Sequence, residues 1–302
     1  MTSGMTGAAR AASRGAARPA ARLRGKAGGE AAERGLWARY PFLVIILILS
    51  AFPIYWTFTI ASQTNEMVGQ SPPPFLPGGY FLANARRVFD TVDFGKAMVN
   101  SFIVASSITV STLIFCSMAG FAFAKLAFRG RNALLLVVLA TMMCPVQLGI
   151  IPLYIEMQKL GWAQSLLAVI APTAVTGFGV VFMRQYTVQA VPDELLEAGR
   201  MDGCTSWGLY WHVVLPALRP AMAVLGLLTF MQAWNDFMWP VVVLSPQNPT
   251  VQVALSTLAG GKYMDYTLVL GGTALATLPI LIVFAFFGRQ IVGGIMEGAV
   301  KG

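Results

Sequence analysis

Long apolar runs alternate with short polar segments along most of this 302-residue chain. An α-helix needs roughly 20 mainly apolar residues to cross the hydrocarbon core of a bilayer, which is about 30 Å thick. Several runs reach that length, so the pattern predicts an all-α membrane protein with about six transmembrane helices. We expect these spans at residues 41–60, 98–124, 133–157, 164–186, 221–244 and 267–288.

The composition agrees with lipid as the main solvent of the chain. Apolar residues make up 56% of it and charged residues only 11%, whereas soluble domains contain about 25% charged residues. The formal net charge of +8 does not indicate a nucleic-acid partner, because the basic residues lie mainly in one terminal arm and in short loops, as membrane topology requires. The three cysteines have neither metal-ligand nor disulfide spacing.

The basic residues also predict the orientation of the chain. Residues 1–39 are rich in Ala, Gly and Arg without a sustained apolar stripe, so we expect a disordered basic cytoplasmic arm, followed by a transmembrane domain over residues 40–302. The first apolar run is too long for a signal peptide and no obvious cleavage site follows it, which favours a retained helix. With the amino terminus inside, most of the 21 Lys and Arg residues are cytoplasmic, so both termini are predicted in the cytoplasm.

Residues 187–220 form the longest connection predicted on the cytoplasmic side. Pro192 favours a helix start, and the two acids that follow it suit the positive end of a helix dipole. We therefore expect a short helix from Glu194 to about Met201. The Asp202-Gly203 pair then ends this helix.

A second short helix is expected directly after this break. Thr205 or Ser206 can cap its first turn, and Pro216 ends it before the fifth span. The connection therefore predicts a helix-turn-helix on the membrane surface. Such an exposed mixture of apolar and acidic residues is typical of a docking surface for a partner protein.

The same connection resembles the EAA loop of bacterial ABC importer permeases. That motif has acidic and small residues, then Asp-Gly, then an aromatic residue, then Leu-Pro, and the order matches here. Gly199 and Cys204 depart from the motif, but both keep the side chain small. The matching residues are Val191-Pro192-Asp193-Glu194-Leu195-Leu196-Glu197-Ala198-Gly199, Asp202-Gly203-Cys204, Tyr210 and Val213-Val214-Leu215-Pro216.

Two further segments resemble carbohydrate-uptake permeases of the maltose and glycerol-phosphate type. Residues 233–240 are similar to part of their fifth helix, and residues 290–302 are similar to the carboxyl tail of the shorter of their two permeases. The resemblance covers residues 40–302. It implies a type I ABC importer permease fold in the cytoplasmic (inner) membrane.

The resemblance also implies partners. Such a subunit assembles with a second permease, two ATP-hydrolysing subunits and an extracellular solute-binding protein, and its EAA loop contacts the ATPase. Glu197 is expected to make a polar contact with the nucleotide-binding subunit, and Gly203 to allow close backbone approach. The ATPase-coupling residues expected by resemblance are Pro192, Glu194, Leu195, Glu197, Ala198, Asp202, Gly203, Leu215 and Pro216.

We expect no catalytic, cofactor-binding or metal-ligating residue in the chain itself. The sequence has no G-x-x-x-x-G-K-[ST] phosphate loop, so ATP is expected to bind to a partner subunit. His212 is the only histidine, and it has no second ligand at a suitable spacing. The chain is therefore not predicted to be an enzyme.

Asp236 is the one acid well inside a predicted span, with Asn235 beside it. Acids within a membrane usually face a cavity or a partner, so these two residues and the flanking Trp234 and Trp239 are candidates for a translocation path. Two alternatives stay open. Asp236 can instead be a hydrogen-bonded strut within the bundle, and the tryptophans can belong to the aromatic belt at the membrane interface.

Residues 245–266 form the external loop between the fifth and sixth spans. By its position in the related permeases, this loop is expected to reach toward the solute-binding protein. Its candidate contacts are Gly260, Gly261, Lys262 and Tyr263.

The predicted function is that of the transmembrane permease subunit of an ABC importer for a carbohydrate or related solute, driven by a separate ATPase through the EAA loop. The main alternative is an ion-coupled secondary transporter, which normally needs several ionisable groups in the membrane and broken helices. A membrane-embedded enzyme is a third class, but the sequence offers no paired acids, no histidine cluster and no set of a nucleophile with a base for it.

Overall fold

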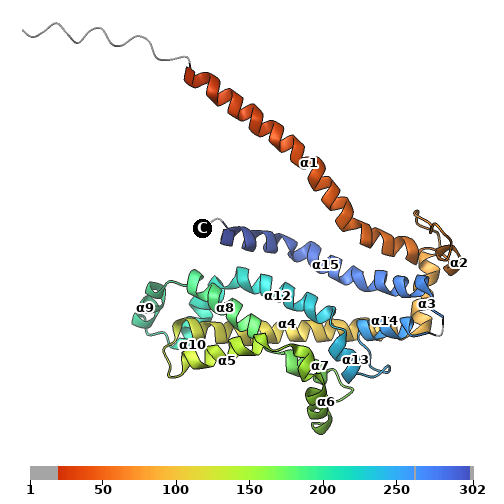
Figure 1. Ribbon diagram of the computed structural model, residues 1–302. Helices are drawn as coiled ribbons and strands as arrows, with labels where there is room; N and C mark the ends of the chain where they lie inside the picture. Colours follow the sequence, from red (N-terminus) through yellow and green to blue (C-terminus); the bar gives the residue numbers. More distant parts are fainter. Residues whose placement is uncertain (1–19, 262, 300–302) are drawn as a thin grey trace, which may run out of the picture. The chain divides into compact units, whose positions relative to one another are not determined.

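The computed structural model describes residues 20–261 and 263–299. Every regular element within these residues is helical (Figure 1), which confirms the predicted all-α class. The chain divides into two compact units, Met1–Trp56 and Thr57–Gly302. The second unit contains all the candidate site residues.

The described part of the first unit is one helix, α1 (Ala20–Ala61), whose last residues belong to the second unit. Residues 20–39 are helical, whereas the sequence pattern predicts a disordered arm there. Ala, Arg, Lys and Glu are strong helix formers, and this local propensity needs no apolar stripe. The predicted domain boundary at residue 40 stays a prediction.

The second unit is built around α4 (Phe94–Lys125), which packs against α8 (Gly177–Ala190) and α12 (Arg219–Trp234) (Figure 1). α15 (Tyr266–Ala299) lies beside α12 and α3 (Phe81–Thr91). The other helices are α2 (Asn65–Val68), α5 (Arg131–Met143), α6 (Ile150–Lys159), α7 (Leu167–Thr173), α9 (Asp193–Met201), α10 (Ser206–Leu209), α11 (Leu215–Ala217), α13 (Met238–Val243) and α14 (Val251–Ala259), with a 3-10 helix at Val146–Gly149 and a π-helix at Tyr210–Val214.

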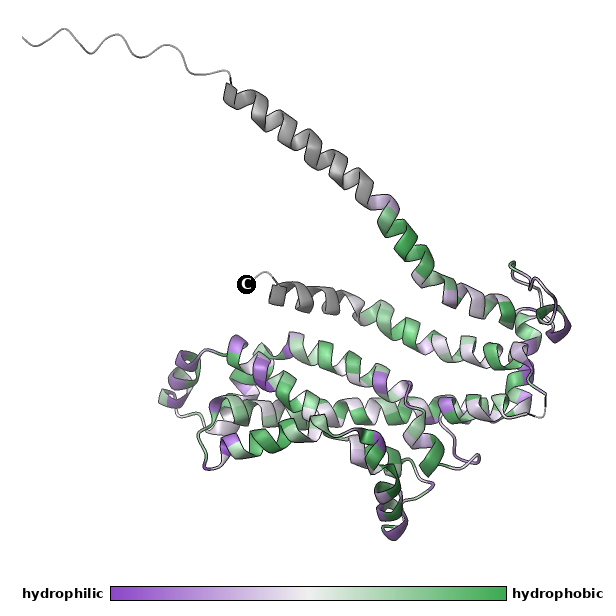
Figure 2. Ribbon diagram, in the orientation of Figure 1, coloured by the Kyte–Doolittle hydropathy of each residue, from purple (hydrophilic) through white to green (hydrophobic). Residues whose placement is uncertain are grey.

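Apolar residues dominate the long helices of the second unit, whereas polar residues gather on α9 (Figure 2). Many large apolar side chains of the long helices are exposed, among them Phe102, Leu136 and Phe286. Contiguous apolar surface of this kind is unfavourable in water. The exposed sides of these helices therefore match a lipid environment.

Two glycines let α4 and α8 approach closely. A Cβ atom added at Gly120 would lie 2.7 Å from the Arg184 backbone nitrogen and 2.7 Å from the Met183 Cβ, and a Cβ atom at Gly179 would lie 2.7 Å from the Cys116 Sγ. Small residues at such contacts permit van der Waals packing of helix backbones in membranes.

Replacing Gly120 with valine is expected to destabilise the α4–α8 pair. Because one obstructing atom belongs to the α8 backbone, the two helices must separate, and overpacking of this kind costs about 1–3 kcal/mol. The melting temperature of the detergent-solubilised protein measures the effect. Gly149→Val is the control, because a Cβ atom at Gly149 meets nothing within 4 Å. Equal melting temperatures for the two variants would contradict the close approach.

Three helices among the described residues are long and apolar enough to cross a membrane alone: Tyr40–Ala61, Phe94–Lys125 and Tyr266–Phe286. They coincide with the first, second and sixth predicted spans. Three further helix pairs pass the same test only together, across a bend. The described chain therefore has three to six candidate spans, and six stays a prediction.

The third predicted span, residues 133–157, is bent by 93° between α5 and Val146–Lys159. Pro145 lies at the bend, and proline disfavours helical angles in the residue before it. Cys144 is accordingly extended, with φ −80° and ψ 123°. The fourth predicted span, residues 164–186, is bent by 41° between α7 and α8.

The fifth predicted span, residues 221–244, consists of two helices. α12 ends at Trp234, and α13 follows after a short break. Asn235 and Asp236 occupy this break, and short polar side chains compete with a helix by bonding to nearby backbone groups. The Asn235 Nδ2 donates to the Met231 carbonyl oxygen at 2.8 Å. The structure therefore differs from the expected continuous helix.

Candidate functional site

The two regions expected to contact partner proteins lie at opposite ends of α4. At the carboxyl end, the Lys125 Nζ lies 2.7 Å from the Asp193 Oδ1 of α9. Toward the amino end, the Asn100 Nδ2 donates to the Pro249 carbonyl oxygen at 2.8 Å. With a rise of 1.5 Å per residue, Lys125 and Asn100 are separated by about 37 Å along the helix, which is enough to span a bilayer core.

The first region is the α9–α11 segment, defined as residues 193–217. α9 begins after Pro192, which is extended with ψ 148°, and has Asp193 and Glu194 in its first turn. It ends at Met201. The expected helix from Glu194 to Met201 therefore agrees with the structure to within one residue.

Most residues expected to couple to an ATPase are exposed on and beside this segment. Leu195 is 51% exposed, whereas its neighbour Leu196 is 2% exposed and faces the interior. Leu215 is partly buried. The exposed members are Pro192, Glu194, Leu195, Glu197, Ala198, Asp202, Gly203 and Pro216. The segment thus presents a mixed acidic and apolar surface.

The turn after α9 is a Schellman motif centred on Gly203. The Gly203 N–H donates to the Arg200 carbonyl oxygen at 3.0 Å, and the Cys204 N–H donates to the Gly199 carbonyl oxygen at 2.9 Å, which is the bond pattern of this motif. Gly203 has φ +82°, a left-handed conformation that glycine adopts without a steric penalty. A Cβ atom here would meet nothing within 4 Å. Within this chain, the backbone angle and not crowding explains the glycine.

The second part of the segment begins as the sequence predicts. The Thr205 Oγ1 caps α10 by accepting a hydrogen bond from the Gly208 N–H at 3.3 Å. α10 continues through the π-helix Tyr210–Val214 into α11, which ends one residue after Pro216. The chain then bends by 76° into α12.

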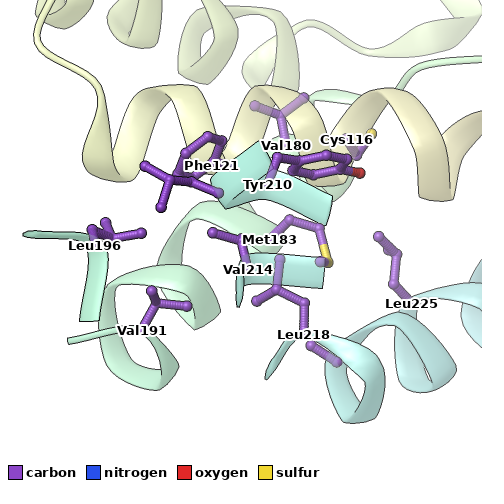
Figure 3. Packing of buried hydrophobic residues seen from close by; sticks show 12 residues of the cluster. Cys116, Phe121, Val180, Met183, Val191, Leu196, Tyr210, Val214, Leu218 and Leu225 are labelled. Atoms are coloured by element: carbon purple, nitrogen blue, oxygen red, sulfur yellow. The ribbon is translucent and has the colours of Figure 1, made fainter. Parts of the chain in front are cut away.

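The α9–α11 segment shares one hydrophobic core with the long helices (Figure 3). Leu196, Tyr210 and Val214 of the segment pack in the same cluster as Phe121 of α4 and Met183 of α8. Protein interiors are close-packed and transmit strain. The segment and the ends of α4 and α8 therefore share one packed core.

Gly199, one of the departures from the EAA pattern, has a packing reason. A Cβ atom at Gly199 would lie 2.5 Å from the Leu209 Cδ2, and Leu209 is fully buried in α10. The absence of a side chain at Gly199 therefore lets α9 and α10 pack together.

Trp234 and Trp239, two candidates for a translocation path, lie in the core of this chain. The Trp234 Nε1 donates to the Ala276 carbonyl oxygen at 3.2 Å, and the Trp239 Nε1 donates to the Ala168 carbonyl oxygen at 2.9 Å. Both indoles are buried. Each therefore joins two helices, α12 to α15 and α13 to α7.

Asn235 is exposed, while Asp236 beside it is partly buried. Asp236 lies just before the start of α13, and its backbone N–H donates to the Ala233 carbonyl oxygen at 3.4 Å. Partial burial of Asp236 is compatible both with the strut and with an acid that lines a path. Asn235 is the member of the path set whose side chain is accessible.

The external segment after α14 contains the residues expected to meet a solute-binding protein. Gly260, Gly261 and Tyr263 are exposed, and Tyr263 is 86% exposed. Lys262 lies outside the described residues. Another protein could therefore reach these three residues.

Asp265 attaches this external segment to α3. Its carboxylate pairs with the Arg87 guanidinium and accepts hydrogen bonds from the Thr267 Oγ1 and the Leu268 N–H. Partial burial by itself would raise the pKa of Asp265, but these hydrogen bonds and the Arg87 charge together lower that pKa below its ordinary value. Arg87 and Asp265 are 178 positions apart, so no local sequence pattern indicates their pairing.

Replacing Asp265 with asparagine is expected to lower stability at pH 7 and to matter less as the pH falls below about 4. A carboxyl group whose pKa is lowered by folding stabilises the folded state above its ordinary pKa, and this contribution is lost as the pH falls through the folded-state pKa. The difference at pH 7 is expected to be at most about 1 kcal/mol, because Arg87 is half exposed. Thermal unfolding in detergent across this pH range measures it, and a pH-independent difference would contradict the ion pair.

The sequence of this chain is similar to that of a known protein family and of several of its members. The sequence profile of the family described as "Binding-protein-dependent transport system inner membrane component" matches residues 113–293. The chain is 38% identical to the arabinooligosaccharides transport system permease protein AraQ of Halalkalibacterium halodurans, over 67% of this chain and 73% of that protein. It is 32% identical to the lactose transport system permease protein LacG of Rhizobium radiobacter, over 87% of this chain and 95% of that protein.

Solved structures with a similar fold include one of an importer. It is a crystal structure of a bacterial ABC transporter involved in the import of the acidic polysaccharide alginate, and one of its chains matches with a TM-score of 0.72 at 24% sequence identity. The match covers 85% of this chain and 96% of that chain. The helical arrangement described above is therefore similar to that of an ABC importer subunit.

Proposed function

Because the chain belongs to the family of binding-protein-dependent transport system inner membrane components, we propose that its spans form part of a solute pathway and that its α9–α11 segment receives the driving force from a separate ATPase. The chain is a membrane-embedded permease of an ABC importer. It supplies the spans and the docking surface, while ATP is bound and hydrolysed by a partner subunit.

The observation that carries this proposal is the two-sided construction of the α9–α11 segment. Its outer side exposes Leu195, Glu197 and Met201, whereas Leu196 and Val214 on its inner side belong to the core of the spans. An element built in this way can bind a partner and move the spans at the same time. Closure and opening of an ATPase pair can then alternate the spans between outward-open and inward-open arrangements.

We propose an oligosaccharide as the transported solute. Two relatives have names that refer to arabinooligosaccharide and lactose transport. Asn235 supports a neutral sugar, because it is exposed and its side-chain amide can both donate to and accept from sugar hydroxyl groups.

The proposed assembly contains a second permease, two ATP-hydrolysing subunits and an extracellular solute-binding protein. In this assembly both termini and the α9–α11 segment lie in the cytoplasm, and residues 260–263 face the solute-binding protein. The contacts of Asp193 and Pro249 with opposite ends of α4 support the placement of these two regions on opposite sides of the membrane.

An ion-coupled secondary transporter is the weaker candidate. Such carriers rely on several ionisable groups near the bilayer midplane. The fifth predicted span contains a single acid, Asp236. The family to which the chain belongs favours the ATP-driven mechanism.

Reconstitution tests the proposed function. The chain is placed in proteoliposomes with a second permease, an ATPase and a solute-binding protein of the same organism's carbohydrate importers, and uptake of arabinotriose is measured. Uptake is expected to require ATP on the side of the ATPase and to be insensitive to an uncoupler. Uptake that proceeds without ATP and stops with an uncoupler would contradict the proposal.

A further inference from the structure

Tyr210 extends a polar atom from the α9–α11 segment to α4. Its hydroxyl oxygen lies 2.7 Å from the Ser117 Oγ, and both side chains are buried. The Ser117 Oγ also lies 2.6 Å from the Leu113 carbonyl oxygen, which can only accept. Ser117 has a single hydroxyl hydrogen and donates it to its own helix, so Tyr210 is the donor to Ser117. A directed chain of hydrogen bonds thus runs from the segment to the α4 backbone.

The other side of Tyr210 contacts the exposed surface of the segment. The rings of Trp207 and Trp211 contact the Tyr210 ring edge-on, with centroid distances of 6.2 Å and 5.3 Å. Both indoles are more than half exposed. A partner that displaces either tryptophan therefore displaces Tyr210.

Ser117 lies where α4 packs tightly against two other helices. Its neighbour Cys116 contacts α8 at Gly179, where an added Cβ atom would lie 2.7 Å from the Cys116 Sγ. Leu113, the acceptor from Ser117, contacts α12 at Gly226, where the corresponding distance to the Leu113 Cδ1 is 3.3 Å. A displacement delivered to Ser117 consequently reaches α4, α8 and α12 together.

We propose that the Tyr210–Ser117 hydrogen bond transmits movement of the α9–α11 segment to α4, which makes both residues positioning residues for transport. This inference rests on the proposed coupling to an ATPase. The apolar contacts around the pair allow sliding, whereas a hydrogen bond between two buried hydroxyl groups requires a narrow range of distance and angle. The bond therefore fixes the register between the segment and the span.

Two substitutions test the link in the complete importer reconstituted in proteoliposomes. Tyr210→Phe removes one hydroxyl group and keeps the ring, and Ser117→Ala removes the acceptor. For both variants we expect normal co-purification of the ATPase and about fivefold more ATP hydrolysed per arabinotriose taken up, the factor that corresponds to one lost hydrogen bond. The double variant is expected to be no worse than either single variant, because both changes remove the same bond.

Thr187→Val is the matched control. The Thr187 Oγ1 is buried and donates to the Met183 carbonyl oxygen of the same helix at 2.6 Å, so this change removes a buried hydrogen bond beside the same core and leaves the link intact. We expect a normal ratio of ATP to solute for this variant.

Three results would each overturn the link. These are an unchanged ratio in Tyr210→Phe, a fivefold change in the Thr187→Val control, and effects that multiply in the double variant. Failure of the wild-type chain to co-purify with the ATPase would instead contradict the proposed function, so the two failures are distinguishable.

Discussion

Replacing Glu197 with lysine is expected to lower ATP-driven uptake at least tenfold without changing the amount of chain in the membrane. Glu197 is exposed on α9, and its carboxylate makes no hydrogen bond or ion pair with the rest of the described chain. Charge reversal therefore costs this chain little stability. Breaking a polar contact at a protein interface costs about 2–5 kcal/mol, which exceeds a tenfold change in affinity.

Co-purification of the ATPase with the variant permease measures this effect, together with uptake of arabinotriose. Asp90→Lys is the control, because it makes the same charge change at an exposed acid on α3. The control is expected to retain the ATPase. If Glu197→Lys also retained the ATPase and transported arabinotriose at the wild-type rate, Glu197 would have no part in docking.

The α9–α11 segment could be predicted from the sequence because its signals are local. Pro192 and the two acids after it indicate the start of α9, and Asp202-Gly203 indicates its end within one turn. The Thr205 cap has the same local character. Each signal depends on backbone groups only a few residues away, so tertiary structure is not needed to interpret it.

The sequence does not predict the interruptions of the spans. A hydropathy pattern reports how apolar a stretch is and not whether one continuous helix runs through it. Pro145 was a visible signal for the bend after α5, since proline restricts the residue before it. At Asn235 and Asp236 the sequence indicates possible path residues, but it does not predict that the Asn235 side chain bonds to the backbone of α12. The apolar windows on either side gave no sign that the helix ends.

The contacts that join distant parts of the chain lie beyond sequence reasoning. Tyr210 and Ser117 are 93 positions apart, and only the packing of the π-helix Tyr210–Val214 on α4 brings them together. The burial of Trp234 and Trp239 has the same origin, because an indole in an apolar run can face the core, the lipid interface or a path with the same sequence pattern. Which of these occurs depends on the neighbouring helices.

Replacing Gly203 with valine is expected to lower ATP-driven uptake about tenfold, because valine at φ +82° is strained. The left-handed conformation costs an ordinary residue roughly 1–2 kcal/mol, and a β-branched residue is a pronounced outlier there. The Schellman motif that ends α9 would be lost, and the docking surface on α9 would no longer keep its angle to α10. Uptake of arabinotriose and co-purification of the ATPase measure the consequence.

Gly203→Asn separates the two explanations of this glycine. Asparagine tolerates the left-handed conformation and also ends helices, so a backbone requirement predicts near-normal uptake for this variant. A close approach of the partner backbone, the role expected by resemblance, predicts a loss as large as that of valine, because the Cβ atom would point into space that is empty in this chain and filled by the ATPase. Near-normal uptake by Gly203→Asn would therefore mean that Gly203 acts by ending α9, and equal losses would mean that the partner occupies the space beside it.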